Sequence, residues 1–346
     1  MAVLRRRGRR PDTGSLDPAA DLDLDAVAAA VLDAAEAALG ERLALDHGPE
    51  PVLGYGPDAY RVRLATADPR WSGTLLARTS DPAVLAREAA WLDALRTHGF
   101  PAAEPVAGPE AADAGVLVFR QPPGDSLATA MVANITAVPQ FLAAFGQLHG
   151  RLHALPAGDL GVEDASGWDD PLDELVARTG PEAVGAEVAG ELGWLADHRP
   201  GGGAPVPCHT ELSPAYVYLE GTDTATATAV NWTRARLTDA AYDVAGTVTA
   251  FWSVPIYVDN ALHRRALKMA RDSLVATYLD AYRAAAPAPP DEDGLRYWQA
   301  FHVGWLIVDV VRRLHGVNGP WEGGTIVPQP DATLAELRDR FRELTA

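Results

Sequence analysis

The segment Cys208-His209-Thr210-Glu211-Leu212-Ser213-Pro214-Ala215-Tyr216-Val217-Tyr218-Leu219 decides the fold of this 346-residue chain. Its second half, 215–219, is a short apolar run, and a similar run follows at 226–231. Short runs of this kind between turn residues predict strands. A Gly-Pro-rich break at 200–205 precedes the pair, and helical spacing of apolar residues resumes at Ala240. We therefore expect a β-hairpin embedded among helices.

Helical patterns dominate the chain on both sides of this hairpin. Apolar residues trace one helical face from Phe141 to Leu155. The segment 297–309 is rich in aromatic residues at helical spacing, which indicates a core helix. Contact of Trp298, Trp305 or Asp309 with a ligand is the alternative interpretation.

The first 125 residues have a different pattern. Residues 1–20 are rich in arginine and are expected to be a disordered basic tail, and a helix is predicted from Leu22 to Leu43. Short strands are then predicted at 60–64 and 73–78, a helix from Ala83 to His98, and a strand at 115–119. A small antiparallel sheet with one helix follows from this order. A second, helical lobe starts near Ser126.

Composition and charge limit the classes of partner. The chain has 29 Lys plus Arg residues against 47 Asp plus Glu, a net charge of -18. This balance disfavours nucleic acid and anionic membranes as partners, and no apolar stretch reaches the ~20 residues of a membrane span. The one cysteine, Cys208, excludes an intramolecular disulfide. Without a recognisable export signal, we expect a cytoplasmic protein whose partners are small molecules, peptides or proteins.

Two motifs resemble those of the aminoglycoside phosphotransferase family. The family pattern is H-G-D-x-x-x-x-N, a hydrophobic strand, I-D-W/F-E, and then G-D-P-x-x-D-V/L-A. In this chain His209, Trp232 and the terminal Asp243-Val244-Ala245 match the pattern in order and spacing. The resemblance implies an α+β, bilobal protein-kinase-like fold with a small mixed N-lobe at 21–121, containing an antiparallel sheet. A larger helical C-lobe would occupy 122–346.

Three positions of the motifs carry substitutions. Glu211 stands at the position of the family's base aspartate, Tyr216 at that of the magnesium-binding asparagine, and Asn231 at that of the principal magnesium aspartate. A phenol and a neutral amide are weaker ligands for Mg²⁺ than the family's amide and carboxylate. Glu211 is either a displaced general base or a structural carboxylate. Asp239 is an alternative acid that could have taken a metal role.

Further short matches concern the nucleotide and the scaffold. The resemblance implies that Gly54 and Gly56 form the glycine turn over the phosphates, although a simple hairpin turn is the alternative. Arg78 and Glu88 correspond to the family's ion pair near the phosphates, with a plain surface pair as the alternative. Phe119 and Gln121 lie at the interlobe hinge, where they would contact a nucleotide. The implied scaffold of the site is His209, Trp232 and Asp243.

His149 and His153 are four residues apart, a spacing that can hold a metal ion. The matching helix of the family is structural, and no glutamate of an H-E-x-x-H motif accompanies the pair. We therefore expect no protein-held metal there or elsewhere.

The sequence supports two classes of function. The first is a kinase-like protein with impaired phosphotransfer, which binds a small molecule, a peptide or a partner protein in the interlobe cleft. The alternative is an atypical ATP-dependent phosphotransferase, or a kinase-fold enzyme repurposed in a biosynthetic pathway. The sequence allows ATP as a cofactor, with weak or no dependence on Mg²⁺, and otherwise implies no cofactor.

Overall fold

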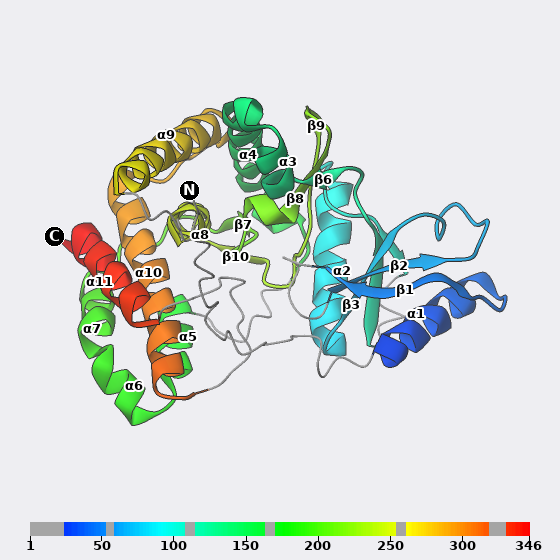
Figure 1. The fold of residues 1–346 in the computed structure, drawn as a ribbon, viewed down its shortest axis with the longest axis horizontal. Coiled ribbons are helices and arrows are strands. Elements are labelled where there is room, and N and C mark those ends of the chain that lie inside the picture. The colour runs from blue at the N-terminus through cyan, green and yellow to red at the C-terminus, as the bar shows by residue number, and fades with distance from the viewer. Residues whose placement is uncertain (1–23, 53–58, 108–114, 163–169, 254–260, 318–329) are drawn as a thin grey trace, which may run out of the picture.

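The computed structural model describes residues 24–52, 59–107, 115–162, 170–253, 261–317 and 330–346. Within these ranges the chain forms two lobes (Figure 1). The N-terminal lobe contains the larger sheet, and the C-terminal lobe is mainly helical. The α+β, bilobal fold expected from the sequence is confirmed.

The N-lobe is built around a five-stranded antiparallel sheet. Residues that alternate along its central strands face opposite sides, as the two-residue period of a strand requires. Leu75 and Ala77 pack with helix α1, whereas Leu76 packs with helix α2. Both faces of the sheet are thus covered. The elements are α1 (Leu24–Leu39), β1 (Leu45–Pro51), β2 (Ala59–Leu64), β3 (Leu75–Thr79), α2 (Pro82–Thr97), β4 (Pro105–Ala107) and β5 (Val116–Arg120), with strand order β1-β2-β3-β5-β4.

The predicted helices and central strands of the N-lobe are confirmed, but two edge strands were missed. Strand β1 has the sequence LDHGPEP, whose prolines, glycine and charged residues disfavour a strand. Its pairing with β2 is irregular, as expected for an exposed edge. Strand β4 has only three residues. Both strands are specified by pairing with their neighbours rather than by local pattern.

The C-lobe contains the predicted hairpin among helices. Strands β8 and β9 form it, and β6 extends it to three strands. A second small sheet pairs β7 with β10 and was not predicted. The elements are β6 (Asp125–Ser126), α3 (Leu127–Ala133), α4 (Val138–His153), α5 (Pro171–Thr179), α6 (Glu182–Glu187), α7 (Ala189–Asp197), β7 (Val206–Cys208), β8 (Val217–Glu220), β9 (Asp223–Ala229), β10 (Arg236–Thr238), α8 (Ala240–Ser253), α9 (Ala261–Ala285), α10 (Glu292–Leu314) and α11 (Pro330–Thr345), with 3-10 turns η2 (Ile135–Ala137), η3 (Ala157–Asp159) and η4 (Pro214–Tyr216).

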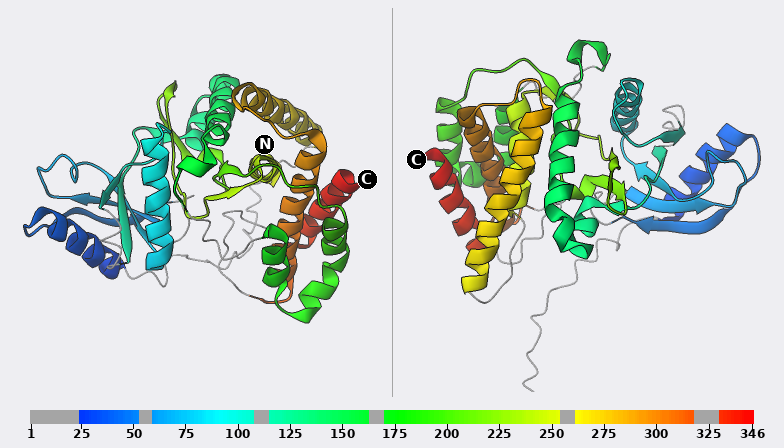
Figure 2. Two further views of the ribbon diagram at one scale, coloured as in Figure 1. Left: turned by 180° about the vertical axis from the view of Figure 1, so that it is seen from behind. Right: turned by 90° about the horizontal axis from the view of Figure 1, so that it is seen from above.

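Helices α4 and α9 lie side by side at very short range (Figure 2). A Cβ atom on Gly146 would lie 2.3 Å from the carbonyl oxygen of Tyr278, and one on Gly150 would lie 2.7 Å from the Cβ of Ala285. The two glycines are four residues apart, so both face α9. Their missing side chains allow the backbones of the two helices to approach each other.

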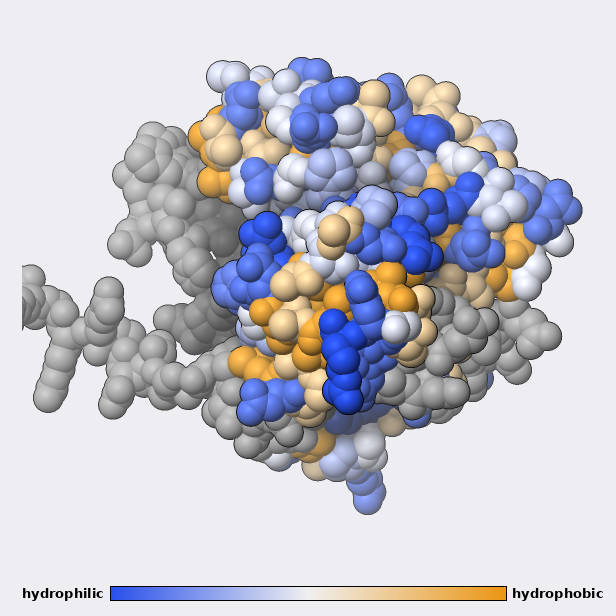
Figure 3. Space-filling view, turned by 90° about the vertical axis from the view of Figure 1, so that its right-hand side faces the viewer, coloured by the Kyte–Doolittle hydropathy of each residue, from blue (hydrophilic) through white to orange (hydrophobic). Residues whose placement is uncertain are grey.

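The surface of the N-lobe side mixes hydrophilic and hydrophobic residues. Hydrophobic residues are interspersed with hydrophilic ones on the face of the molecule seen from the N-lobe side (Figure 3). Among the described residues no single helix is long and apolar enough to cross a membrane. Helices α3 and α4 pass such a test together, but they are bent by 118° at their junction.

The glycine contact gives a test of the α4–α9 packing. We expect Gly146→Ala to lower the free energy of unfolding by about 1–3 kcal/mol, because the new methyl group clashes with fixed backbone. Gly193→Ala on α7 is the matched control: its Cβ would meet nothing within 4 Å, and alanine should stabilise that helix by up to about 1 kcal/mol. Denaturant unfolding measures both. Equal effects of the two substitutions would contradict the close packing.

Candidate functional site

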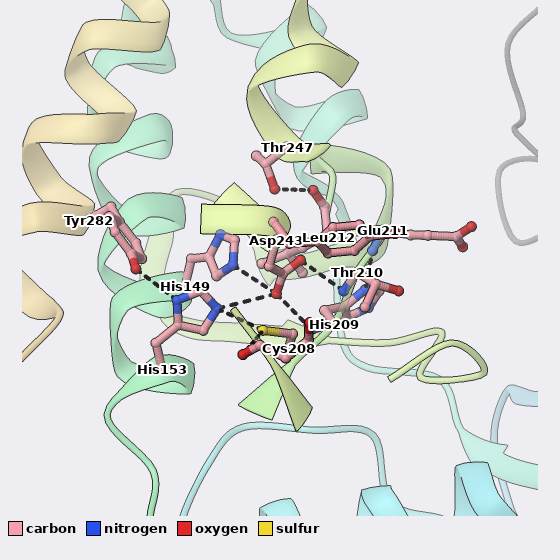
Figure 4. Close-up of polar contacts among 12 residues, drawn as sticks. His149, His153, Cys208, His209, Thr210, Glu211, Leu212, Asp243, Thr247 and Tyr282 are labelled. Carbon is pink, nitrogen blue, oxygen red and sulfur yellow. Dashed lines mark hydrogen bonds and ion pairs between the residues drawn. The ribbon is translucent and has the colours of Figure 1, made fainter. Parts of the chain in front are cut away.

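The loop between β7 and β8 is held by a buried carboxylate, that of Asp243 in the first turn of α8 (Figure 4). Its Oδ1 accepts a hydrogen bond from the backbone N–H of Thr210 at 2.8 Å, and its Oδ2 accepts one from His209 N–H at 2.7 Å. The Asp243 side chain is fully buried. The position of this loop is therefore fixed by α8.

The charge of Asp243 is stabilised from helix α4. Burial alone would raise the pKa of this carboxyl, but the nearby His149 imidazole and the hydrogen bonds of His149 and His153 outweigh it and hold the pKa well below its usual range. The Nε2 atoms of His149 and His153 lie 3.1 and 3.3 Å from Asp243 Oδ2. Asp243 is therefore an anion in the folded protein.

His209 joins the loop to the hairpin. Its Nε2 donates to the carbonyl oxygen of Val230 at 2.8 Å. The centre of its ring lies 4.7 Å from the centre of the Trp232 ring. Burial lowers the pKa of this imidazole to about 4. A neutral ring agrees with the second contact, in which His209 Nδ1 accepts the Glu211 N–H at 3.4 Å. The predicted scaffold position of His209 and Asp243 agrees with these contacts.

Two residues of the site have backbone conformations that favour glycine. Thr210 has φ of 68° and Asn231 has φ of 67°. Asparagine tolerates this region, whereas a β-branched residue such as threonine is strained there. Thr210 is held by its bond to Asp243 and by its hydroxyl, which donates to the Arg234 carbonyl oxygen at 3.0 Å. It occupies the glycine position of the H-G-D pattern.

The N-lobe contributes a second buried network to the site. Arg78 on β3 forms an ion pair with Glu88 on α2 at 3.1 Å, and the two side chains are 3% and 1% exposed. Another nitrogen of the Arg78 guanidinium donates to Asn231 Oδ1 at 2.7 Å. Glu88 Oε1 accepts the backbone N–H of Trp232 at 2.9 Å. The expected ion pair is confirmed, and the alternative of a plain surface pair is wrong because both partners are buried.

Glu211 points away from the Asp243 cluster (Figure 4). Its carboxylate lies 3.6 Å from the guanidinium of Arg234, and its side chain is 30% exposed. Arg234 also donates to Glu174 on α5 at 2.8 Å. The carboxylate at the base position is therefore partly neutralised by an arginine.

The same part of the C-lobe has further paired charges around Trp305. The guanidinium groups of Arg178 and Arg234 lie 5.2 and 5.6 Å from the centre of this indole ring. Arg178 donates to Asp309 at 2.7 Å. Trp305 is half-buried, and Asp309 is nearly buried at 7% exposure.

Tyr216 lies in the turn η4 next to the loop histidine. Its ring stacks on that of His209, with the ring centres 6.0 Å apart. Its carbonyl oxygen accepts the N–H of Val230, the residue just before Asn231, at 2.9 Å. The substituted position Tyr216 is thus occupied by a partly buried aromatic ring.

The remaining predicted residues have mixed outcomes. Phe119 is 1% exposed and packs in the main core, and Gln121 accepts a hydrogen bond from Arg61 at 3.0 Å, so nucleotide contact by either residue stays a prediction. Asp239 accepts the Ala241 N–H at 2.8 Å at the start of α8, which is a helix-capping contact. Gly54 and Gly56 lie outside the described residues.

Four residues of the site were missed at the sequence level. Arg234 and Glu174 gave no signal, because each is an ordinary charged residue whose partner is far away in the sequence. On α9, the hydroxyl of Tyr278 is hydrogen-bonded to His149 of α4, and that of Tyr282 is hydrogen-bonded to His153 of the same helix. Their four-residue spacing equals that of the histidines, which was an available clue.

A sequence model described as "Phosphotransferase enzyme family" matches residues 50–298 of the chain. The chain belongs to this family. The match spans both lobes, including the Asp243 and Glu88 networks. The comparison with curated proteins found no match.

Solved structures of phosphotransferases have the same fold. An aminoglycoside phosphotransferase-like protein from Ralstonia eutropha JMP134 is 15% identical, with a TM-score of 0.62, covering 90% of this chain and 96% of that one. Amicoumacin kinase hAmiN, solved in complex with AMP-PNP, Ca²⁺ and Ami, is 14% identical, with a TM-score of 0.56, covering 82% of this chain and 85% of that one. Choline kinase LicA from Streptococcus pneumoniae is 12% identical, with a TM-score of 0.55 and coverage of 90% and 98%. The phosphotransferase fold is thus shared at low identity.

The buried ion pair of this phosphotransferase-family chain gives a stability test. We expect Arg78→Met to lower the free energy of unfolding by about 3–5 kcal/mol, since it leaves the Glu88 carboxylate buried without its cation. The double variant Arg78→Met, Glu88→Gln should lose less free energy of unfolding than Arg78→Met alone. Arg296→Met, which breaks an exposed pair with Asp293, is the control and should cost less than about 1 kcal/mol. Strictly additive effects at positions 78 and 88 would contradict a direct pairing.

The neutral state of His209 predicts sensitivity to acid. The imidazole binds its proton near pH 6.5 in the unfolded chain but near 4 in the folded one. Between these values the unfolded chain holds more protons, so stability falls as the pH drops, by up to about 3 kcal/mol from this residue. His209→Gln retains a donor for the Val230 carbonyl and should make urea unfolding less dependent on pH in this window. An unchanged pH dependence would argue against a neutral buried His209.

Proposed function

We propose that this chain is a kinase-fold protein with impaired magnesium-dependent phosphotransfer, which uses its interlobe cleft to bind a ligand. The observation that carries the proposal is the contact between Arg78 and Asn231 at 2.7 Å. Asn231 stands at the family's principal magnesium position and has one amide oxygen to offer. That oxygen already accepts hydrogen bonds from Arg78 and, at 3.3 Å, from the Thr233 hydroxyl.

A cation at this position would face two obstacles. It would have to displace the Arg78 guanidinium from the Asn231 oxygen, and it would meet a positive charge in place of a negative one. Mg²⁺ prefers carboxylates and phosphate oxygens in regular octahedral geometry. The triad of Arg78, Glu88 and Asn231 contains one positive and one negative charge, so it is neutral without any metal.

The other two substituted positions support the same function. The Tyr216 phenol stacks beside His209 and is a poor ligand for Mg²⁺ at neutral pH. The Glu211 carboxylate is near Arg234, which favours its charged form but competes with a substrate hydroxyl for it. Phosphoryl transfer depends on positioning and on neutralising charge with the metal. Losing both metal ligands therefore impairs the reaction more than a displaced base does.

The charges next to Glu211 disfavour a polycationic acceptor. Glu174 and Asp309 are each paired with an arginine, as is Glu211 itself. An aminoglycoside would have to break these pairs to find free carboxylates. A neutral or anionic group, on a small molecule, a peptide or a partner protein, fits this surface better.

The second candidate is an atypical ATP-dependent phosphotransferase. It is favoured by Glu211, which retains a carboxylate at the base position and is 30% exposed. Relatives of this fold were solved with AMP-PNP or AMP, which supports ATP as a ligand in both candidates. The two candidates differ in whether ATP is consumed.

The magnesium dependence of ATP binding tests the proposal. We expect ATP, if bound, to raise the melting temperature equally with Mg²⁺ and with EDTA, because Asn231 and Tyr216 do not hold the ion. A saturating ligand at 100 times its dissociation constant stabilises by about 2.7 kcal/mol, which thermal shift resolves. A shift that requires Mg²⁺ would contradict the proposal. ATP hydrolysis abolished by Glu211→Gln would favour the second candidate instead.

Combined reversion provides the positive control. We expect the triple variant Glu211→Asp, Tyr216→Asn and Asn231→Asp to gain Mg²⁺-dependent nucleotide binding, whereas each single substitution gives little. Repairing one element leaves the others limiting. Isothermal titration with ATP and Mg²⁺ measures the gain. Full recovery by Asn231→Asp alone would show that the other two substitutions are not limiting.

A further inference from the structure

A polar bridge joins strand β2 to the end of strand β5, next to the connection between the lobes. Tyr60 and Val62 on β2 pack in the cluster with α1, so Arg61 between them lies on the opposite face of the sheet. The Nε of Arg61 donates to the side-chain oxygen of Gln121 at 3.0 Å. Gln121 directly follows β5, from which the chain continues into the C-lobe.

The strand register places this bridge above β3. Arg61 is paired with Leu76 on β3, and Leu76 is paired with Phe119 on β5. The backbone N–H of Gln121 donates to the carbonyl oxygen of Thr74 at 3.2 Å, which continues the same ladder and keeps Gln121 on the Phe119 face. Because β3 lies between β2 and β5, the two side chains span two strand spacings, about 9–10 Å. They therefore meet over β3.

The sheet residues beneath the bridge are apolar and fully covered. Leu76 is 0% exposed and Phe119 is 1% exposed. Arg78 lies two residues after Leu76 on the same face of β3, and it contacts Asn231 of the C-lobe. This face is therefore the one turned toward the C-lobe. The bridge thus lies over an apolar patch, formed by Leu76 and Phe119, on the interlobe side of the sheet.

The bridge is held less firmly than the neighbouring ion pair. Arg78 and Glu88 are 3% and 1% exposed and carry opposite charges. Arg61 and Gln121 are both partly exposed, and the acceptor is a neutral amide. Among the residues that the structure describes, no carboxylate forms an ion pair with Arg61. Opening the bridge therefore leaves no buried charge unpaired, and water or an anion can replace the amide as the partner of the guanidinium.

We propose that the Arg61–Gln121 bridge is an autoinhibitory contact of the interlobe cleft. It covers the Leu76–Phe119 patch, against which a planar ring of the ligand would pack, and it opens when that ring binds. The released guanidinium then pairs with an anionic group of the same ligand. The ligand class is a planar ring with an anionic substituent, such as a nucleotide. This inference rests on the proposed function, because it requires that the cleft binds a ligand.

Adenosine tests the bridge, because it has the planar ring of a nucleotide but no charge for Arg61 to attract. We expect Arg61→Ala and Gln121→Ala each to raise the affinity for adenosine about tenfold, which corresponds to one hydrogen bond to a charged group. The double variant should bind no more tightly, since each single substitution removes the same bond. Arg63→Ala is the matched control: it lies on the same face of β2, is exposed, and pairs with Asp46 at 3.9 Å. Isothermal titration measures all variants.

The outcomes separate this inference from the proposed function. If either Arg61→Ala or Gln121→Ala leaves the affinity for adenosine unchanged or lowers it, the bridge is not autoinhibitory. Absence of adenosine binding in every variant would overturn the bridge as well, but not the proposed function, which does not require a nucleotide. A requirement for Mg²⁺ in ATP binding by the parent chain would contradict the proposed function and leave the adenosine result unaffected.

The cover over Leu76 can also be measured without a ligand. N-ethylmaleimide is uncharged and should label the thiol of Leu76→Cys slowly, because that position is buried. Addition of Arg61→Ala should raise the labelling rate at least tenfold, whereas addition of Arg63→Ala should not. Cys208 is buried and gives the same background in each variant. Equal labelling rates with and without Arg61 would overturn the proposal, and the adenosine titration decides if Leu76→Cys does not fold.

Discussion

The buried carboxylate of Asp243 is the constraint on which the candidate site depends. A charge removed from water must be matched by donors, or its burial costs several kcal/mol. Asp243 receives N–H groups from the backbone of His209 and Thr210, and it faces the rings of His149 and His153. Both backbone N–H groups must face this carboxylate at once. That requirement keeps Thr210 at a strained φ of 68°.

The buried carboxylate of Glu88 in the N-lobe is likewise matched by donors. Its carboxylate pairs with Arg78 and accepts the Trp232 N–H, so it links β3, α2 and the segment after β9. Asn231, the second non-glycine residue with positive φ, lies directly before Trp232. Both substituted loops are therefore held by buried carboxylates. The geometry of the site is maintained by these anchors and does not require that the site catalyse a reaction.

Sequence reasoning succeeded where the signal lies in order and spacing. His209, Trp232 and Asp243 follow one another in a fixed pattern, and Arg78 and Glu88 sit on a predicted strand and helix, so the fold and the anchors could be predicted. The burial of the Arg78 pair could not, because the contact of Arg78 with Asn231 joins positions 153 residues apart. Strands β1, β7 and β10 are stabilised by pairing with distant segments rather than by local propensity. The ion pairs of Arg234 involve charged residues that look ordinary in sequence, and no pattern indicates which of many carboxylates will lie nearby.

Charge balance distinguishes the two buried networks. In the N-lobe, Arg78 is balanced by Glu88, and a neutral Asn231 adds a hydrogen bond without adding charge. An aspartate there would add a negative charge and so favour a cation. The cluster at Asp243 is different, because its anion is matched by hydrogen-bond donors: the backbone N–H groups of His209 and Thr210 and the imidazoles of His149 and His153. Asn231 therefore lies in a network whose charges cancel, whereas the charge of Asp243 is stabilised by hydrogen bonds from two segments of the backbone and from helix α4.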